Sequence, residues 1–347
     1  MNTNRTEPPL LRPDRDWQGL CLADVEAARC RLAHGVRRTP CPIAPGLSEM
    51  FGRTIWLKRD DLQRTGSFKE RGARNALLML SEIERTRGVV AASAGNHALG
   101  LAYHGAQLGV RVTVIMPVNA PEVKVTRCRT LGATVVLHGR TFEEAHAHAE
   151  AIAADTGAGV IHPFDDVRVM AGQGTMALEI LEQVPQLDTL IVPVGGGGLL
   201  AGVATVVKTL RPEVRLVAVE PENAAGFRAA MRQREPVMHA LAPTVADGLA
   251  VARVGVRTFG VASSRIDDVV TVSEREIGEA MALLARRCGA VVEGAGAAGL
   301  AAVLSGKVGG SAIVLPVCGR NVDPQVHARV LEAHATPERE RIIARAA

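Results

Sequence analysis

Lys69 lies where a short polar segment gives way to a helical pattern, and its surroundings favour a reactive amine. Ser67 and Glu70 have the spacing of a capping box, which predicts a helix start with Lys69 inside the first turn. The positive end of a helix disfavours a second positive charge, so we expect the pKa of Lys69 to be lower than that of a surface lysine. A neutral lysine amine forms imines with aldehydes. On spacing alone, a solvated lysine at a helix start is the simpler interpretation.

Residues 92–98, Ala-Ser-Ala-Gly-Asn-His-Ala, follow an apolar strand and open a helix. Ligands of open α/β sheets bind beyond the carboxyl ends of strands, and a helix start offers free amides to a carboxylate. Ser93, Gly95 and Asn96 suit such a loop because they are small, rich in donors and tolerant of unusual dihedral angles. The alternative is an ordinary turn with an Asn cap.

A second loop carries four consecutive glycines, Gly195, Gly196, Gly197 and Gly198, between a strand and a helix. Such a loop lets backbone amides converge on a phosphate. The Gly-Lys-Ser/Thr of a P-loop is absent. A dinucleotide-binding fold is the rival interpretation, because Gly196, Gly198 and Ala201 fit its glycine pattern and Glu220 ends the next strand at the distance of a ribose contact.

A fourth segment runs from a strand at 312–316 into Cys318-Gly319-Arg320-Asn321. Further strands are predicted at 89–92, 111–116, 134–137, 159–161, 190–194, 215–219 and 269–272. Helical periodicity fills most of the intervals, and another helix is predicted at 22–34. This alternation predicts parallel sheets wrapped by helices. Residues 1–18 are expected to form a loose arm and residues after Pro337 a charged end.

The 347 residues are 47% hydrophobic and 22% charged, as in a soluble globular protein with a large core. The net charge of +4 is dispersed, which excludes nucleic-acid binding, and no apolar run reaches the roughly 18 residues of a membrane span. The amino terminus lacks an apolar signal core. The six cysteines form no CxxC pair and predict reduced thiols in a cytoplasmic protein.

Residues 65–73, Thr-Gly-Ser-Phe-Lys-Glu-Arg-Gly-Ala, resemble the lysine segment of the fold type II pyridoxal-phosphate enzymes, in the branch of threonine dehydratase and serine racemase. The match continues in colinear order over about residues 38–325. It implies that Lys69 carries pyridoxal 5'-phosphate covalently and acts as the catalytic residue. The other implied cofactor-binding residues are Phe68, Asn96, the four glycines 195–198 and Cys318. The implied substrate-binding residues are Ser93, Ala94, Gly95, Asn96 and His97.

The resemblance also assigns roles within these segments. The loop at 93–97 holds the substrate carboxylate, Asn96 bonds the ring hydroxyl of the cofactor, and Cys318 faces the pyridine nitrogen. Serine racemases have a catalytic serine at position 94, where this chain has alanine, so we expect weak racemisation. Arg320 replaces a usual glycine and either alters substrate choice towards an acidic side chain or points to solvent.

Relatives with a divalent-cation site use positions that map onto Glu220, Ala224 and Gly226, and the glycine supplies no carboxylate. No metal ligands are therefore assigned, and a divalent cation stays an open question. Without the resemblance, Glu220 is interpreted as a surface acid at a strand end.

We therefore predict an α/β protein with two open, mostly parallel sheets wrapped by helices. A large cofactor-binding domain is expected at 1–87 and 156–330, a small domain carrying the Asn96 loop at 88–155, and a charged tail at 331–347. The predicted reaction is dehydration and deamination of L-threonine or L-serine to a 2-oxo acid and ammonia by a cytoplasmic homodimer.

Alternatives are a dehydratase for hydroxyaspartate or a hydroxyectoine-derived amino acid, and a serine racemase. A nicotinamide-dinucleotide oxidoreductase or a non-catalytic amino-acid sensor would belong to a different class.

Overall fold

Nine strands form two separate parallel sheets within residues 19–120 and 122–335, the part of the chain that this computed structural model describes. The five-stranded sheet has the order β1 (Thr54–Lys58), β9 (Ala312–Pro316), β6 (Thr189–Pro193), β7 (Arg215–Pro221) and β8 (Asp268–Val272). The four-stranded sheet has the order β4 (Thr134–Leu137), β3 (Val112–Met116), β2 (Val89–Ala92) and β5 (Gly159–Val160). Every strand pair is parallel, as the alternation of strands and helices predicted.

Helices cover both faces of the larger sheet, because alternate residues of each strand point to opposite sides. Leu190 and Val192 of β6 pack into one apolar core, and Ile191 packs into another. The first core is covered by α1 (Leu22–Leu32), α8 (Val167–Gln183), α9 (Gly198–Leu210), α10 (Gly226–Gln233) and α11 (Val256–Ala262). The second is covered by α2 (Pro45–Phe51), α12 (Glu274–Cys288) and α13 (Gly294–Leu304), with α14 (Pro324–Ala333) packed outside α12.

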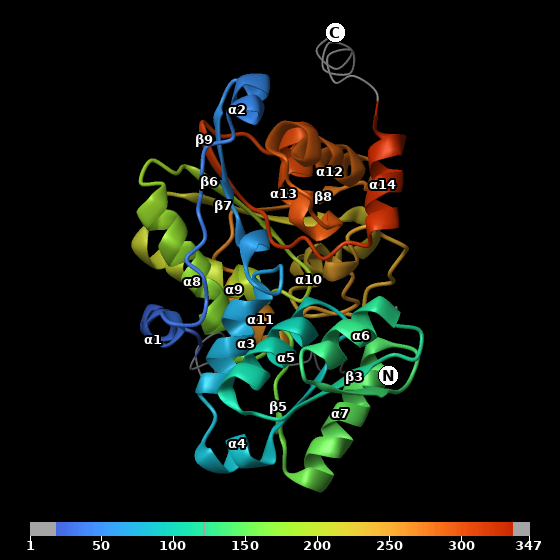
Figure 1. Cartoon of the computed structure of the whole chain (residues 1–347). Coiled ribbons are helices and arrows are strands. Elements are labelled where there is room, and N and C mark those ends of the chain that lie inside the picture. Colours follow the sequence, from blue (N-terminus) through green and yellow to red (C-terminus); the bar gives the residue numbers. More distant parts are fainter. Residues whose placement is uncertain (1–18, 121, 336–347) are drawn as a thin grey trace, which may run out of the picture.

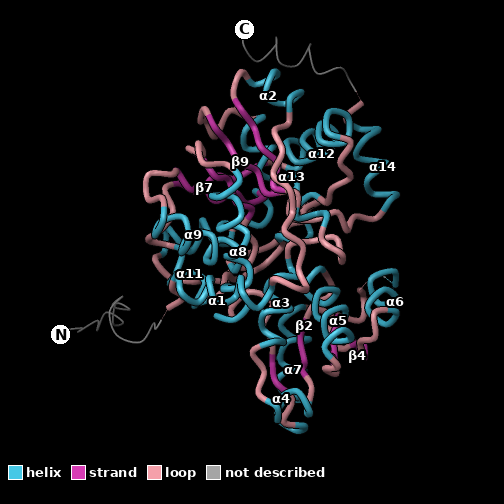
Figure 2. The backbone as a smooth tube through the Cα atoms, turned by 60° about the vertical axis from the view of Figure 1, so that its left-hand side comes forward, coloured by secondary structure: helices cyan, strands magenta, loops and turns pink. Residues whose placement is uncertain are grey.

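The smaller sheet is covered in the same way and lies at one end of the molecule (Figure 1). Its first core includes residues of α3 (Lys69–Leu78), α5 (Asn96–Leu108) and α6 (Glu122–Thr130), and its second includes residues of α7 (Phe142–Thr156). The short helix α4 (Glu82–Arg87) leads into β2. Figure 2 shows the strands of the two sheets as separate groups, with α3 lying between them. Helix α3 therefore connects the two parts of the fold, since it packs against both α5 and α8.

The sequence predicted eight of these strands, with ends that differ by at most two residues. It missed β1, because this five-residue strand ends in Lys58 and the charged residues that follow it resemble the start of a loop. The helix predicted at 22–34 ends at Leu32. In the described ranges no helix is both long and apolar enough to span a membrane.

The division into two domains stays a prediction. The strand β5 of the smaller sheet lies beyond the range 88–155 that the sequence gave to the small domain. The predicted arm at 1–18 lies outside the described residues, and so does the predicted tail from 336 onwards, whereas residues 331–333 belong to α14.

Candidate active site

The carboxyl ends of β1, β9 and β6 bring the predicted segments together, because parallel neighbours end at the same edge of a sheet. The chain after β1 returns to the chain after β9: the N–H of Phe68 donates to the carbonyl of Cys318 at 3.0 Å, and Ser67 forms a bridge with Gly319. Asn96, at the start of α5 beside the smaller sheet, reaches this edge through the carboxylate of Glu293. The site is thus built from both sheets.

Lys69 is the first residue of α3, directly after Phe68 at the helix N-cap. Its Nζ donates to the carbonyl oxygen of Pro163 at 2.8 Å and lies 5.3 Å from the centroid of the Phe68 ring. Burial lowers the pKa of Lys69 to about 8, although the nearby Glu293 carboxylate opposes the shift. The predicted direction is confirmed, but removal from water is its main cause.

The predicted capping box at Ser67 and Glu70 is wrong. The Glu70 carboxylate bonds the N–H of Thr65 and lies 3.2 Å from Nε2 of His104, so it turns to the preceding loop and to α5. The Ser67 hydroxyl is buried and has no hydrogen-bond partner among the described residues. Glu70 therefore shapes the loop that precedes Lys69, and the hydroxyl of Ser67 is left for another partner.

The four glycines lead into the 13-residue helix α9, whose first amides have no partner within the helix. A Cβ atom on Gly196 would lie 2.2 Å from the Phe164 ring, and Gly197 has a φ of 93°. Thr258 fastens the loop, because its hydroxyl donates to the carbonyl of Gly196 at 2.7 Å. Only glycine allows this close packing, which holds a cradle of amides in the form that suits a phosphate.

The position of Glu220 corrects two interpretations, that of a surface acid and that of a ribose contact. It is 1% exposed, so it is not a surface acid, and its two carboxylate oxygens accept the N–H groups of Phe227 at 2.6 Å and Arg228 at 2.8 Å. Burial raises the pKa of Glu220 to about 7. Both oxygens bond the start of α10, and the buried carboxylate is not exposed for the ribose contact that the dinucleotide interpretation needs.

The Asn96 loop forms the start of α5, with Gly95 at the N-cap. The Ser93 hydroxyl accepts from the N–H of Gly95 at 3.2 Å, and Ala94 is half-buried beside it. His97 is buried, and its Nε2 lies 3.3 Å from the carbonyl oxygen of Ile161. Burial lowers the pKa of His97 to about 3, so the imidazole is neutral at neutral pH.

Cys318 lies buried after β9, with Sγ 3.6 Å from the carbonyl oxygen of Pro316. Burial raises the pKa of this thiol well above its usual range, so it stays protonated. Arg320 is exposed, and its backbone N–H donates to the carbonyl of Gly66. Of the two interpretations of Arg320, its exposure favours a side chain that points to solvent.

Sequence reasoning missed Glu293 and Asn321 as site residues. Both bond the Asn96 amide, at 2.7 Å through Nδ2 and 2.6 Å through Oδ1 respectively. An acidic residue directly before a glycine-rich helix was the available signal for Glu293, since it stands at the N-cap of α13. Its distance of 197 positions from Asn96 hides the pairing.

The residues fit pyridoxal phosphate. No described residue bonds Thr65 Oγ1, Ser67 Oγ or His97 Nδ1, although all three atoms are buried. Buried polar atoms without partners are costly unless a ligand satisfies them. Together with a lysine amine of lowered pKa and a cradle of amides, they match a ligand that carries an aldehyde, a phosphate and a polar ring.

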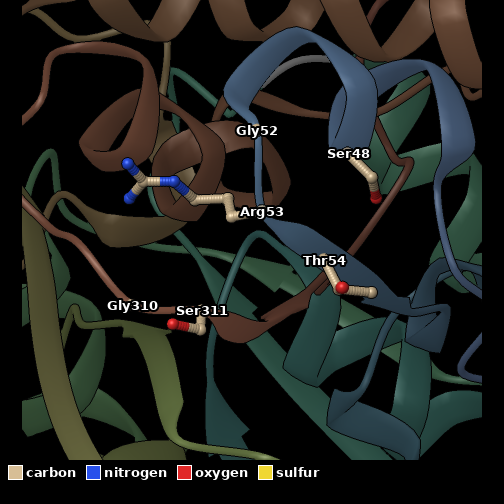
Figure 3. Close-up of a pocket in the computed structure, with 6 residues that line it drawn as sticks. All are labelled: Ser48, Gly52, Arg53, Thr54, Gly310 and Ser311. Carbon is tan, nitrogen blue, oxygen red and sulfur yellow. The ribbon is translucent and has the colours of Figure 1, made fainter.

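One pocket lies away from this site, at the amino ends of β1 and β9. Figure 3 shows the residues that line it: Ser48, Gly52, Arg53, Thr54, Gly310 and Ser311. It contains none of the predicted site residues and lies at the opposite ends of the strands from the loops described above. It is not the candidate active site.

The fold and the site together define a cofactor-dependent α/β enzyme, and the comparison with known families agrees. Residues 32–319 match the family described as pyridoxal-phosphate dependent enzyme. The match spans most of the chain, so this protein belongs to that family.

Individual members of the family show which branch this chain is most similar to among the proteins compared. The chain is 44% identical over 313 residues to the L-threonine ammonia-lyase of Thermotoga maritima, covering 90% of this chain and 78% of the relative. It is 40% identical to a catabolic L-threonine dehydratase of Staphylococcus aureus, and the match covers 87% of this chain and 89% of the relative. The processed threonine deaminase isoform 2 of Solanum lycopersicum superposes with a TM-score of 0.86 at 36% identity, covering 91% and 92%. Serine racemase of Dictyostelium discoideum superposes with a TM-score of 0.82 at 37% identity, covering 88% and 99%.

Proposed function

We propose that this enzyme eliminates water from L-threonine or L-serine. Hydrolysis of the released imine then takes up one water and gives a 2-oxo acid and ammonia. The observation that carries the proposal is the position of Lys69, a lysine amine with a pKa lowered to about 8 at the start of α3. Its amine bonds the carbonyl of Pro163, and the next residue, Phe164, packs against Gly196 of the glycine loop. The names of the L-threonine ammonia-lyase and dehydratase relatives support the same reaction.

The cofactor supplies an electron sink that acidifies the α-carbon of the bound amino acid. Lys69 would hold the cofactor and, once released from it, accept the α-proton, because an amine with a pKa of about 8 is partly neutral at neutral pH. Gly195, Gly196, Gly197 and Gly198 would hold the phosphate. Phe68 precedes Lys69 at the helix N-cap and would pack against the cofactor ring.

The remaining residues would orient the substrate and the ring. The loop Ser93-Ala94-Gly95-Asn96-His97 would bind the substrate carboxylate at the start of α5. The protonated thiol of Cys318 would face the pyridine nitrogen without a negative charge. Ala94 has no proton to give or take, so only Lys69 serves the α-carbon, and elimination is favoured over racemisation.

The first test asks where the cofactor is attached. We expect borohydride treatment of the holoenzyme, followed by peptide mass mapping, to find the adduct at Lys69. Lys69→Arg is expected to lose turnover, the visible absorption band of the bound cofactor and the adduct, because a guanidinium keeps the charge but does not form the imine. Lys208→Arg, a control at the far end of α9, should retain all three. An adduct on another lysine of active enzyme would refute the proposal.

The second test compares candidate substrates and identifies the amino-acid side chain that the enzyme accepts. We expect ammonia release from L-threonine and L-serine to exceed that from hydroxyaspartate, a hydroxyectoine-derived amino acid and D-serine. The exposed Arg320 gives no support to an acidic substrate. Faster turnover of hydroxyaspartate, or racemisation of L-serine faster than ammonia release, would replace the proposed reaction with one of the alternatives.

We also propose that the two sheets form the cores of two domains, that the enzyme assembles as a homodimer and that it works in the cytoplasm. The Asn96–Glu293 bond between elements of the two parts supports a site at the domain boundary. Six cysteines without a disulfide support a reducing compartment. Sedimentation analysis of the holoenzyme would test the dimer, and fractionation of the producing cells would test the location.

A further inference from the structure

The side-chain amide of Asn96 is held at both of its ends. Its Nδ2 donates to Oε1 of Glu293 at 2.7 Å, and its Oδ1 accepts from Nδ2 of Asn321 at 2.6 Å. Turning the amide over would place its oxygen against the carboxylate and its NH₂ group against another NH₂ group. The two partners therefore select one of the two amide orientations.

The Asn321 amide is fixed in turn by Arg127 of α6. A guanidinium only donates, and NH1 of Arg127 donates to Oδ1 of Asn321 at 2.7 Å. Nδ2 of Asn321 also donates to the carbonyl oxygen of Thr65 at 2.8 Å. The hydrogen bonds run in one direction, from Arg127 through Asn321 and Asn96 to Glu293. A group that only donates stands at one end of this relay, and a carboxyl group that accepts stands at the other.

The accepting end is rigid. Glu293 is 5% exposed, and its backbone N–H donates to the carbonyl of Gly319 at 3.1 Å. A Cβ atom on Gly319 would lie 2.2 Å from Oε1 of Glu293 and 3.3 Å from Nδ2 of Asn96. Only glycine at position 319 leaves room for the carboxyl group to reach the amide.

Glu293 uses only one of the two hydrogens on Nδ2 of Asn96. We propose that Arg127, Asn321 and Glu293 are positioning residues, which fix the Asn96 amide so that its second Nδ2 hydrogen meets the ring hydroxyl oxygen of the cofactor. This inference rests on the proposed function and extends it to three residues. A fixed donor at that oxygen favours its ionised form, so the relay sets the absorption spectrum of the bound cofactor as well as its affinity.

The test compares Arg127→Met with Arg129→Met in purified holoenzyme. Both arginines are exposed on α6, so neither substitution disturbs the core, but only Arg127 belongs to the relay. We expect Arg127→Met to lower the ionised fraction of the cofactor band at fixed pH. It should also raise the Kd for pyridoxal phosphate about three- to tenfold, because the hydrogen bond that Asn96 donates is weakened but not removed. Arg129→Met should match the wild type.

Two further variants separate positioning from structure. Arg127→Lys keeps a side chain that only donates hydrogen bonds. Compared with Arg127→Met, it should recover part of the ionised fraction of the cofactor band. Asn321→Asp places a carboxylate against Oδ1 of Asn96 and should shift the band at least as far as Arg127→Met, with the thermal midpoint of the cofactor-free protein as a check on folding.

If Arg127→Met and Asn321→Asp both keep the wild-type band and Kd, the relay is overturned while the proposed function stands. A wild-type protein that forms no cofactor band would overturn both.

Discussion

Two buried polar regions meet at the first turn of α3, and they differ in how their charges are satisfied. Lys69 belongs to the candidate site. Arg71, two residues later and so on nearly the opposite side of the helix, belongs to a cluster with Lys58, Asp60 and Glu179. Arg71 bonds both oxygens of Asp60 and both oxygens of Glu179, and Lys58 bonds Glu179 and the carbonyl of Thr39.

The same burial has opposite electrostatic results in the two regions. Burial alone would raise the pKa of Asp60, but the Arg71 guanidinium holds it below its usual range. No cation in the described part of the chain bonds Glu293 in the site: burial raises the pKa of Glu293 to about 7, and the charge of Asp247 adds to the rise. The cluster holds its charges and fixes the helix, whereas the site keeps amines, acids and hydroxyls unpaired or close to neutral, as ligand binding and proton transfer require.

The largest expected effect is a loss of stability when the buried ion pairs of Arg71 are broken. Arg71→Met should cost roughly 3–5 kcal/mol of unfolding free energy, because Asp60 and Glu179 would stay buried without their partner. Denaturant unfolding would measure it. Arg29→Met is the matched control, since Arg29 also pairs with an acid on α8, Glu182, but both side chains are more than 40% exposed. Its cost should stay below about 1 kcal/mol. Equal losses in the two variants would contradict the distinction.

The second prediction concerns the pH dependence of stability that Glu293 causes, an acid bonded to an amide rather than to a cation. The folded-state pKa of Glu293 is raised, so its stabilising contribution is complete below the usual value of 4.5 and is lost as the pH rises through about 7. The free energy of unfolding of the cofactor-free wild type should therefore fall by roughly 3 kcal/mol, relative to that of Glu293→Gln, between pH 4.5 and pH 8. Urea unfolding at several pH values would measure the difference.

The contribution of Asp60 to stability depends on pH in the opposite direction. Its pKa is lowered, so its contribution is present above its usual value and is lost only as the pH falls through the lowered folded-state pKa. Wild-type and Glu293→Gln curves that stay parallel from pH 4.5 to 8 would show that Glu293 is charged and satisfied like Asp60.

The smallest expected effect distinguishes an unpaired hydroxyl from a paired one. Ser67→Ala should stabilise the cofactor-free protein by about 1 kcal/mol, because it removes a buried hydroxyl without a partner. Ser48→Ala should destabilise it by about 1 kcal/mol, because the Ser48 hydroxyl donates to the carbonyl of Ala44 and accepts from the N–H of Ile55. Thermal unfolding of both variants is the measurement. A loss of stability in Ser67→Ala would mean that the hydroxyl is satisfied without a ligand.

Much of this protein was predictable from the sequence, because the relevant constraints are local. Strand periodicity gave eight strands, and the parallel sheets followed from their alternation with helices. Glycines 195–198 were recognisable as four consecutive glycines between a strand and a helix, and the close packing of Gly196 and the positive φ of Gly197 show why glycine is needed there. The segment around Lys69 identified the family, which the match over residues 32–319 confirms.

The tertiary structure alone decided what surrounds these segments. Glu70 forms an apparent capping box with Ser67 in the sequence, yet it bonds Thr65 and His104. Glu220 ends its strand like a surface acid, but it lies buried against the start of α10. The partners of Asn96 come from distant parts of the chain. Spacing along a chain fixes which backbone shapes are possible, whereas burial and hydrogen-bond partners depend on contacts between remote segments, and those contacts determine whether an acid or an amine is charged.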